Sequence, residues 1–184
     1  MTSEYLLAKA AETGKRYGRQ DPFRLAEKMG ILMLREPMGT AERACKGFFM
    51  IIARQPVIAV NADLTEDMQR IVVMHEIGHA VLHRNKAALG FHDYELFDTV
   101  SKSEYEANVF AAEYMLADED VLEKLHADLS FFQAAAALRV PPEFLSFKFR
   151  MMKQKGTLVI DSPILADSTF LKRAVPCGSA DDGR

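Results

Sequence analysis

The spacing of apolar residues predicts a mostly helical chain with a small group of strands in its first third. Residues 3–18 carry apolar side chains at helical intervals. Two apolar runs, 47–52 and 57–60, flank Arg54-Gln55 and are typical of a hairpin. Further helices are predicted over residues 22–29, 65–84, 103–115, 118–126, 130–138 and 142–156, and a short strand over 31–34.

Polar residues mark the expected starts of several of these helices. Asp21 followed by Pro22 is a typical helix beginning. Asp63, with Glu66 three positions later, resembles a capping box for helix 65–84. The later helices are expected to be capped by Asp118 and by either Asp128 or Ser130.

One pentapeptide, His75-Glu76-Ile77-Gly78-His79, carries the chemistry that the sequence indicates most clearly. Two histidines four positions apart lie on one helix face, about 40° apart in rotation and ~6 Å apart in rise. Both can therefore bind one zinc ion, and Glu76 is placed to act as the general base of a metallopeptidase. The surrounding segment, 71–82, is otherwise apolar on every side, so the helix is expected to be buried and its polar groups to need a partner such as a metal.

A catalytic zinc ion normally has a third protein ligand, and spacing alone leaves its identity open. His83 is excluded as a ligand because it lies ~12 Å along the helix from His75, too far for one ion to bind both and His79. The glutamates of the following helix are better candidates, and spacing does not choose among them: Glu104, Glu106 and Glu113.

The two segments HEIGHAVLH (75–83) and EYEANVFAAE (104–113) together resemble the signatures of the ImmA/IrrE family of metallopeptidases. The resemblance covers roughly residues 20–155 and departs from the family pattern at 115–118. It implies that His75 and His79 bind Zn²⁺, that Glu106 is the third ligand and that Glu76 is the general base. We expect the chain to be closer to the compact ImmA type, because no C-terminal sensor domain fits in its residues and no separate N-terminal DNA-binding domain is evident.

The expected fold is therefore α+β: a mainly helical, zincin-like metalloprotease domain with a small β-sheet or hairpin and a C-terminal helix-turn-helix-like extension. We expect the metallopeptidase domain at 1–126, a packed helix pair at 127–156, and a weak strand followed by a mobile tail at 157–184. His83, Asn108 and Glu113 are candidates to hydrogen-bond a metal ligand. The residue that stabilises the oxyanion stays open among Tyr94, Tyr105, Tyr114, His83 and His92.

Composition narrows the setting in which the chain works. Its 184 residues carry a net charge of −3, which gives no electrostatic reason to expect nucleic acid or an anionic membrane as partner. No signal peptide and no apolar stretch of membrane-spanning length are evident, and Cys45 and Cys177 form no disulfide framework. The cytoplasm is therefore the expected location. Basic residues near the C-terminus alternate with apolar ones, which favours a packing face over a DNA contact.

The family resemblance implies a protein substrate, a helix-turn-helix repressor or antitoxin whose cleavage relieves transcriptional repression. An extended substrate is expected either to pair with an edge at Val57–Val60 or, if that strand is central, to bind elsewhere. The alternative function is a non-catalytic, metal-binding or toxin-type module that sequesters a regulator. The intact Glu76 argues against that alternative, because a purely structural metal site does not need a general base.

Overall fold

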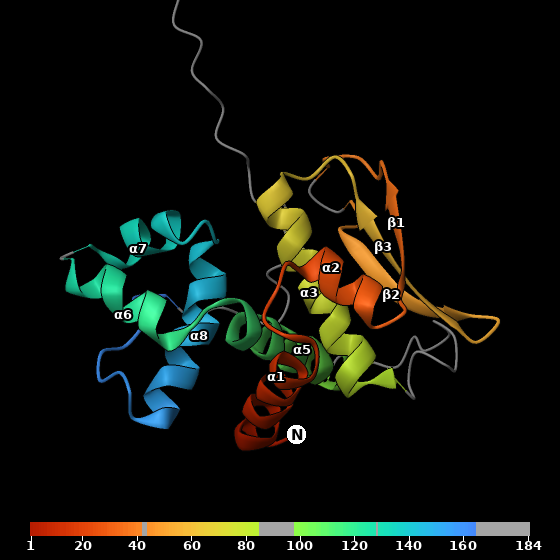
Figure 1. Cartoon of the computed structure of the whole chain (residues 1–184). Coiled ribbons are helices and arrows are strands. Elements are labelled where there is room, and N and C mark those ends of the chain that lie inside the picture. Colours follow the sequence, from red (N-terminus) through yellow and green to blue (C-terminus); the bar gives the residue numbers. More distant parts are fainter. Residues whose placement is uncertain (42–43, 85–97, 128, 165–184) are drawn as a thin grey trace, which may run out of the picture.

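The computed structural model describes residues 1–41, 44–84, 98–127 and 129–164. Within them the fold is α+β, as the sequence predicted, with a three-stranded sheet and a larger set of helices (Figure 1). The strands are β1 (Leu32–Glu36), β2 (Gly47–Ile52) and β3 (Gln55–Asn61). The helices are α1 (Ser3–Tyr17), α2 (Pro22–Lys28), α3 (Glu66–Leu82), α5 (Asp98–Met115), α6 (Asp118–His126), α7 (Phe131–Ala137) and α8 (Pro142–Lys155).

Helices α3 and α5 form the centre of the molecule. In Figure 1 the sheet lies with α2 and α3 at the right of the molecule, and α6, α7 and α8 lie at the left. Helices α1 and α5 lie between these two groups. Helix α3 contacts β2, β3, α2 and α5, and α5 in turn contacts α1 and α8. None of the described helices is long and apolar enough to cross a bilayer.

The sheet has the order β1-β3-β2, with β1 parallel and β2 antiparallel to the central strand. Because β3 is paired on both sides, the hypothesis that a substrate pairs with an edge at Val57–Val60 is wrong. Strand β2 lies tightly against α3: a Cβ on Gly47 would lie 2.5 Å from Val72 Cγ1 and 2.8 Å from the Ala59 carbonyl oxygen. Of the two edge strands, β2 is therefore the one held against the histidine helix.

The helix starts agree with the sequence in part. Asp21 caps α2 and Ser130 caps α7, where Ser130 and Gln133 form a capping box. The predicted Asp63–Glu66 box is wrong, because Thr65 caps α3 and the Asp63 carboxylate accepts instead from the Gly39 N–H, at 2.7 Å. Asp118 does not cap α6 either: the N-cap is Ala117, and the Asp118 carboxylate pairs with lysines of α8.

The crossing of α3 and α5 depends on Gly78. A Cβ at this position would lie 3.2 Å from both Cα and the carbonyl oxygen of Ala107, which is tighter than ordinary contact with backbone that cannot move independently. Gly14 of α1 is a matched control, because its Cβ would meet neighbours only at 3.6 Å and 4.0 Å.

We therefore expect Gly78→Ala to lower the free energy of unfolding by about 1–2 kcal/mol, since overpacking exceeds the gain in helix propensity. Gly14→Ala should leave it unchanged or raise it by up to about 1 kcal/mol. Urea unfolding of both variants measures the difference. Equal stability of the two variants would contradict the close approach of α3 and α5.

The C-terminal helices pack through apolar residues and neutralise most of their cations. Phe144, Phe147, Phe149, Met151 and Met152 are buried, as expected for a packing face. Four of the five cations form ion pairs: Arg139 with Asp67, Lys153 with Asp161, and Lys148 and Lys155 with Glu113 and Asp118. The fifth, Arg150, lies over the ring of Tyr105. Residues 157–164 form no strand, so the prediction of a weak strand is wrong for this part of the segment. Residues 165–184, which include the predicted tail, lie outside the described residues.

Candidate metal centre

Three side chains from α3 and α5 converge on one point inside the molecule. The Nε2 atoms of His75 and His79, one helical turn apart on α3, are 3.0 Å from each other. The Glu104 carboxylate of α5 reaches both, with Oε2 3.3 Å from His75 Nε2 and Oε1 3.4 Å from His79 Nε2. His75 is only 3% exposed, so the cluster is largely shielded from solvent.

The spacing of these donor atoms fits a divalent metal ion. Ligand atoms bound tetrahedrally at 2.0–2.1 Å from zinc are about 3.3 Å apart, close to the three separations of this cluster. Within the described residues, His75, His79 and Glu104 are the group of ligand-type side chains close enough to hold one ion. Two imidazoles and one carboxylate also match zinc chemically.

The two histidines also explain why Glu104 is ionised. Burial alone would raise the pKa of its carboxyl, but hydrogen bonds and charge from His75 and His79 outweigh burial and hold the pKa well below its usual range. Glu104 is therefore a carboxylate, the form in which it can bind a metal ion.

Asn108 fixes the ring of His75. Its Oδ1 lies 2.7 Å from His75 Nδ1, which leaves Nε2 free to face Glu104. Asn108 and Glu104 are four residues apart on α5 and so lie on the same face, about 40° apart. The predicted role of Asn108 as a hydrogen-bond partner of a ligand thus agrees with its position.

Glu106, which the family resemblance gave as the third ligand, faces a different group. Its Oε2 lies 2.9 Å from His83 Nε2, and its Oε1 contacts the amino group of Met1. Within the described residues, the side chains close enough to hold one ion are His75, His79 and Glu104, and Glu106 is not among them. Glu104 is therefore a further candidate for the third ligand.

His83 lies beside the cluster rather than in it. It ends α3, is 8% exposed, and has its Nδ1 3.1 Å from Nδ1 of His79. This position agrees with the geometric argument that excluded His83 as a ligand and with its predicted role next to one.

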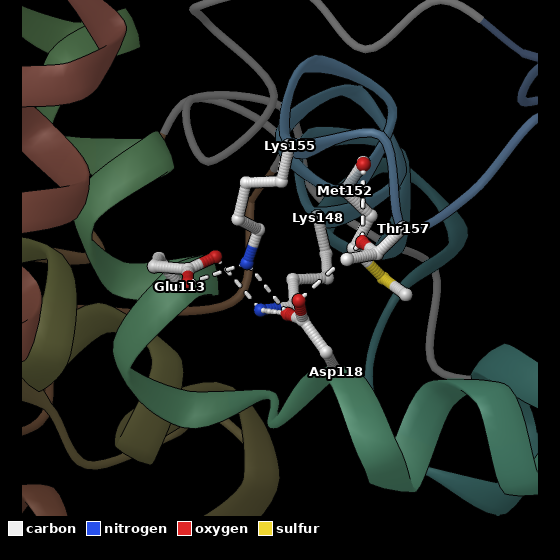
Figure 2. Close-up of polar contacts among 6 residues, drawn as sticks. All are labelled: Glu113, Asp118, Lys148, Met152, Lys155 and Thr157. Atoms are coloured by element: carbon white, nitrogen blue, oxygen red, sulfur yellow. Dashed lines mark hydrogen bonds and ion pairs between the residues drawn. The ribbon is translucent and has the colours of Figure 1, made fainter.

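Glu113, the third residue predicted to support a ligand, does not approach the histidines. It lies nine residues after Glu104, which places it on the opposite face of α5. Figure 2 shows the amino groups of Lys148 and Lys155 of α8 between Glu113 and Asp118. Their Nζ atoms are 2.7 Å and 2.9 Å from the Glu113 carboxylate oxygens. The role of Glu113 is therefore to join α5 to α8.

Glu76 points from α3 toward β2 and is 7% exposed. Burial raises the pKa of its carboxyl to about 7, with the charge of Glu104 adding to this effect, while His79 and a hydrogen bond from the backbone of Phe49 oppose it. A carboxyl with a pKa near neutrality can both accept and return a proton at physiological pH. This is the behaviour expected of a general base.

The candidates for stabilising an oxyanion are reduced by the structure. Tyr105 packs against Phe147, with ring centroids 5.8 Å apart, and the Tyr114 hydroxyl donates to the Gly18 carbonyl at 2.8 Å. Both tyrosines thus serve packing between helices. Tyr94 and His92 lie outside the described residues.

Comparison with known proteins gives two similarities. Residues 26–150 match the family model Peptidase_M78, described as the IrrE N-terminal-like domain, and this range contains all three candidate ligands and Glu76. The chain is also 30% identical over 146 residues to a protein of Bacillus phage phi105 named "Uncharacterized immunity region protein 2". That alignment covers 78% of this chain and 90% of the phage protein.

Proposed function

This chain belongs to the IrrE N-terminal-like family of metallopeptidases, of the ImmA/IrrE type, and we propose that it is a zinc-dependent endopeptidase. The observation that carries the proposal is the convergence of His75, His79 and Glu104 beside a buried glutamate, Glu76. We propose Glu104, in place of Glu106, as the third metal ligand. Zn²⁺ is the proposed cofactor because the donor set and its spacing fit that ion.

In the proposed peptide hydrolysis, the metal ion and Glu76 have different roles. Zinc, when bound, supplies a Lewis acid that can lower the pKa of a water molecule from 15.7 to about 7. Glu76 accepts a proton from the water that attacks the peptide carbonyl and delivers it to the leaving amine. Its pKa of about 7 suits both transfers, and the backbone hydrogen bond from Phe49 holds its carboxyl against β2.

The proposed substrate is a protein regulator. The similar phage protein is named for an immunity region, and we take this name as support for a helix-turn-helix repressor or antitoxin as the target. Cleavage would relieve transcriptional repression in a mobile element. The edge of β2 beside Glu76 offers an extended peptide a strand to pair with, while β3 offers none. The proposed location is the cytoplasm, where such a repressor binds DNA.

Co-expression with candidate helix-turn-helix repressors and antitoxins from the same genome tests this function. We expect the partner to be cut at a defined bond, and we expect a chelator and Glu76→Gln each to abolish the cut. Loss of a general base alone lowers rates by about 10²–10⁴-fold. The matched control is Glu119→Gln, since Glu119 is exposed on α6.

Two results would contradict the proposal. Cleavage that survives Glu76→Gln would remove the proposed mechanism. A stable complex with the partner but no cleavage by the wild-type chain would favour the alternative function, a non-catalytic module that sequesters a regulator.

A further inference from the structure

A continuous line of polar contacts leads away from the candidate metal centre on the side opposite Asn108. It begins at Nδ1 of His79, passes through both nitrogens of His83 and ends at Oε2 of Glu106, over distances of 3.1 Å and 2.9 Å. His83 is 8% and Glu106 5% exposed, so the line is buried and its contacts are protected from water.

With Nε2 of His79 reserved for a metal ion, the contacts assign each remaining proton to one nitrogen. His79 directs Nε2 at His75 and Glu104, so its proton is on Nδ1 if Nε2 is to bind an ion. That N–H donates to Nδ1 of His83, which must then be unprotonated, and His83 carries its own proton on Nε2. This second N–H donates to Glu106, whose carboxylate is an acceptor only.

Resting on the proposed function, we propose that His83 and Glu106 act together as positioning residues that hold His79 in its metal-binding tautomer and orientation. A ligand imidazole commonly donates its second N–H to a carboxylate directly. Here an imidazole stands between the ligand and the carboxylate: His83, one turn beyond His79, contacts His79 through Nδ1 and Glu106 through Nε2. His75 has the simpler arrangement, with Asn108 bound directly.

Burial gives the arrangement its strength. Glu106 Oε2 lies 2.9 Å from His83 Nε2, and Glu106 Oε1 contacts the amino group of Met1. Charge-assisted hydrogen bonds are about twice as strong as neutral ones. Removing either His83 or Glu106 therefore breaks the line of contacts at a buried position.

The affinity of the full-length protein for Zn²⁺, measured by competition with a chelator, tests the proposal without reference to cleavage. We expect His83→Leu and Glu106→Leu each to weaken zinc binding by about 10–100-fold. The double variant should lose no more than either single variant, because the two residues act along one line. His83→Gln should recover most of the affinity, since an amide can accept from His79 and donate to Glu106.

The visible absorption spectrum of the Co²⁺-loaded protein gives a second readout. It should change in His83→Leu, because the ring of His79 is no longer held, and return toward the wild-type spectrum in His83→Gln. His126→Leu, at an exposed histidine of α6, is the control and should change neither measurement.

The outcomes separate this inference from the proposed function. Zinc affinity and cobalt spectra of His83→Leu that equal those of the wild type would overturn the inference and leave the function intact. Additive losses of zinc affinity in the double variant would also overturn the inference, because they would show that His83 and Glu106 act independently. A wild-type protein that binds no zinc would overturn both.

Discussion

Replacing Glu104 by Gln is expected to weaken zinc binding by more than about 100-fold, beyond the loss that follows removal of a group that merely supports a ligand. The amide keeps the shape of the side chain but loses its charge, and its nitrogen cannot bind a metal ion. Both imidazoles then lose the carboxylate that lies 3.3 Å and 3.4 Å from their Nε2 atoms. Cleavage of the protein partner should be lost in parallel.

Glu106→Gln is the matched comparison, because it makes the same change two residues along the same helix. Its amide oxygen can still accept from His83, so zinc affinity should fall by about tenfold or less. Chelator competition ranks the two variants on one scale. The reverse order, with Glu106→Gln the more severe, would restore the assignment that the family resemblance implies and reject the one that the structure supports.

The sequence predicted the histidine helix well because its signals are local. The apolar run around the motif predicted burial, and Ile71, Met74 and Ile77 are fully buried in α3. The spacing of His75 and His79 determines their shared face whatever the helix packs against. Spacing also argued against His83 as a ligand, and its position beside the cluster agrees with that argument, which needs only the rise of a helix.

The third ligand could not be predicted in the same way, because it depends on how α5 is rotated against α3. That rotation is set by the contact of Gly78 with Ala107, a tertiary feature that neither residue reveals alone. One signal was available: Asn108 was expected to support a ligand, and the residue one turn before it on the same face is Glu104. The shared helix face of Asn108 and Glu104 would have favoured Glu104 over Glu106 as the third ligand.

The wrong predictions of helix caps and of a sheet edge also concern contacts between elements. Asp63 and Asp118 have the composition of helix caps, but each carboxylate has a partner distant in sequence, Gly39 and Lys148 respectively. The position of β3 in the sheet depends on its parallel pairing with β1, which no turn connects and no local pattern encodes. Local sequence patterns therefore predicted the helices and strands, whereas contacts between elements determined the helix caps and the order of the strands.

Lys148→Met is expected to lower the free energy of unfolding by about 3–5 kcal/mol, the cost of breaking a buried ion pair by removing one partner. The Lys148 side chain is 0% exposed, and its Nζ lies 2.7 Å from Glu113 and 2.5 Å from Asp118 (Figure 2). Its loss leaves two carboxylates, 12% and 19% exposed, that share the cation of Lys155, and Asp118 also keeps the hydroxyl of Thr157 at 3.5 Å. Methionine fills the volume of the lysine stem, so the loss reports the charge rather than a cavity.

Lys155→Met is the control, since Lys155 makes the same two contacts but is 24% exposed, and a loss of about 1–2 kcal/mol is expected.

The ion-pair cluster of Glu113, Asp118, Lys148 and Lys155 also predicts that the stability of the protein changes with acid. Burial alone would raise the pKa of Asp118, but hydrogen bonds from Lys148 and Lys155 lower it below its unfolded value. The stability that Asp118 contributes is thus complete above the unfolded pKa and is lost as the pH falls through the folded pKa. Urea unfolding at pH 7 and at about pH 3 should show a smaller difference for Lys148→Met than for the wild type, because the variant has lost the cation that lowers this pKa. An equal acid response and a loss below that of Lys155→Met would together contradict a stabilising role for the buried lysine.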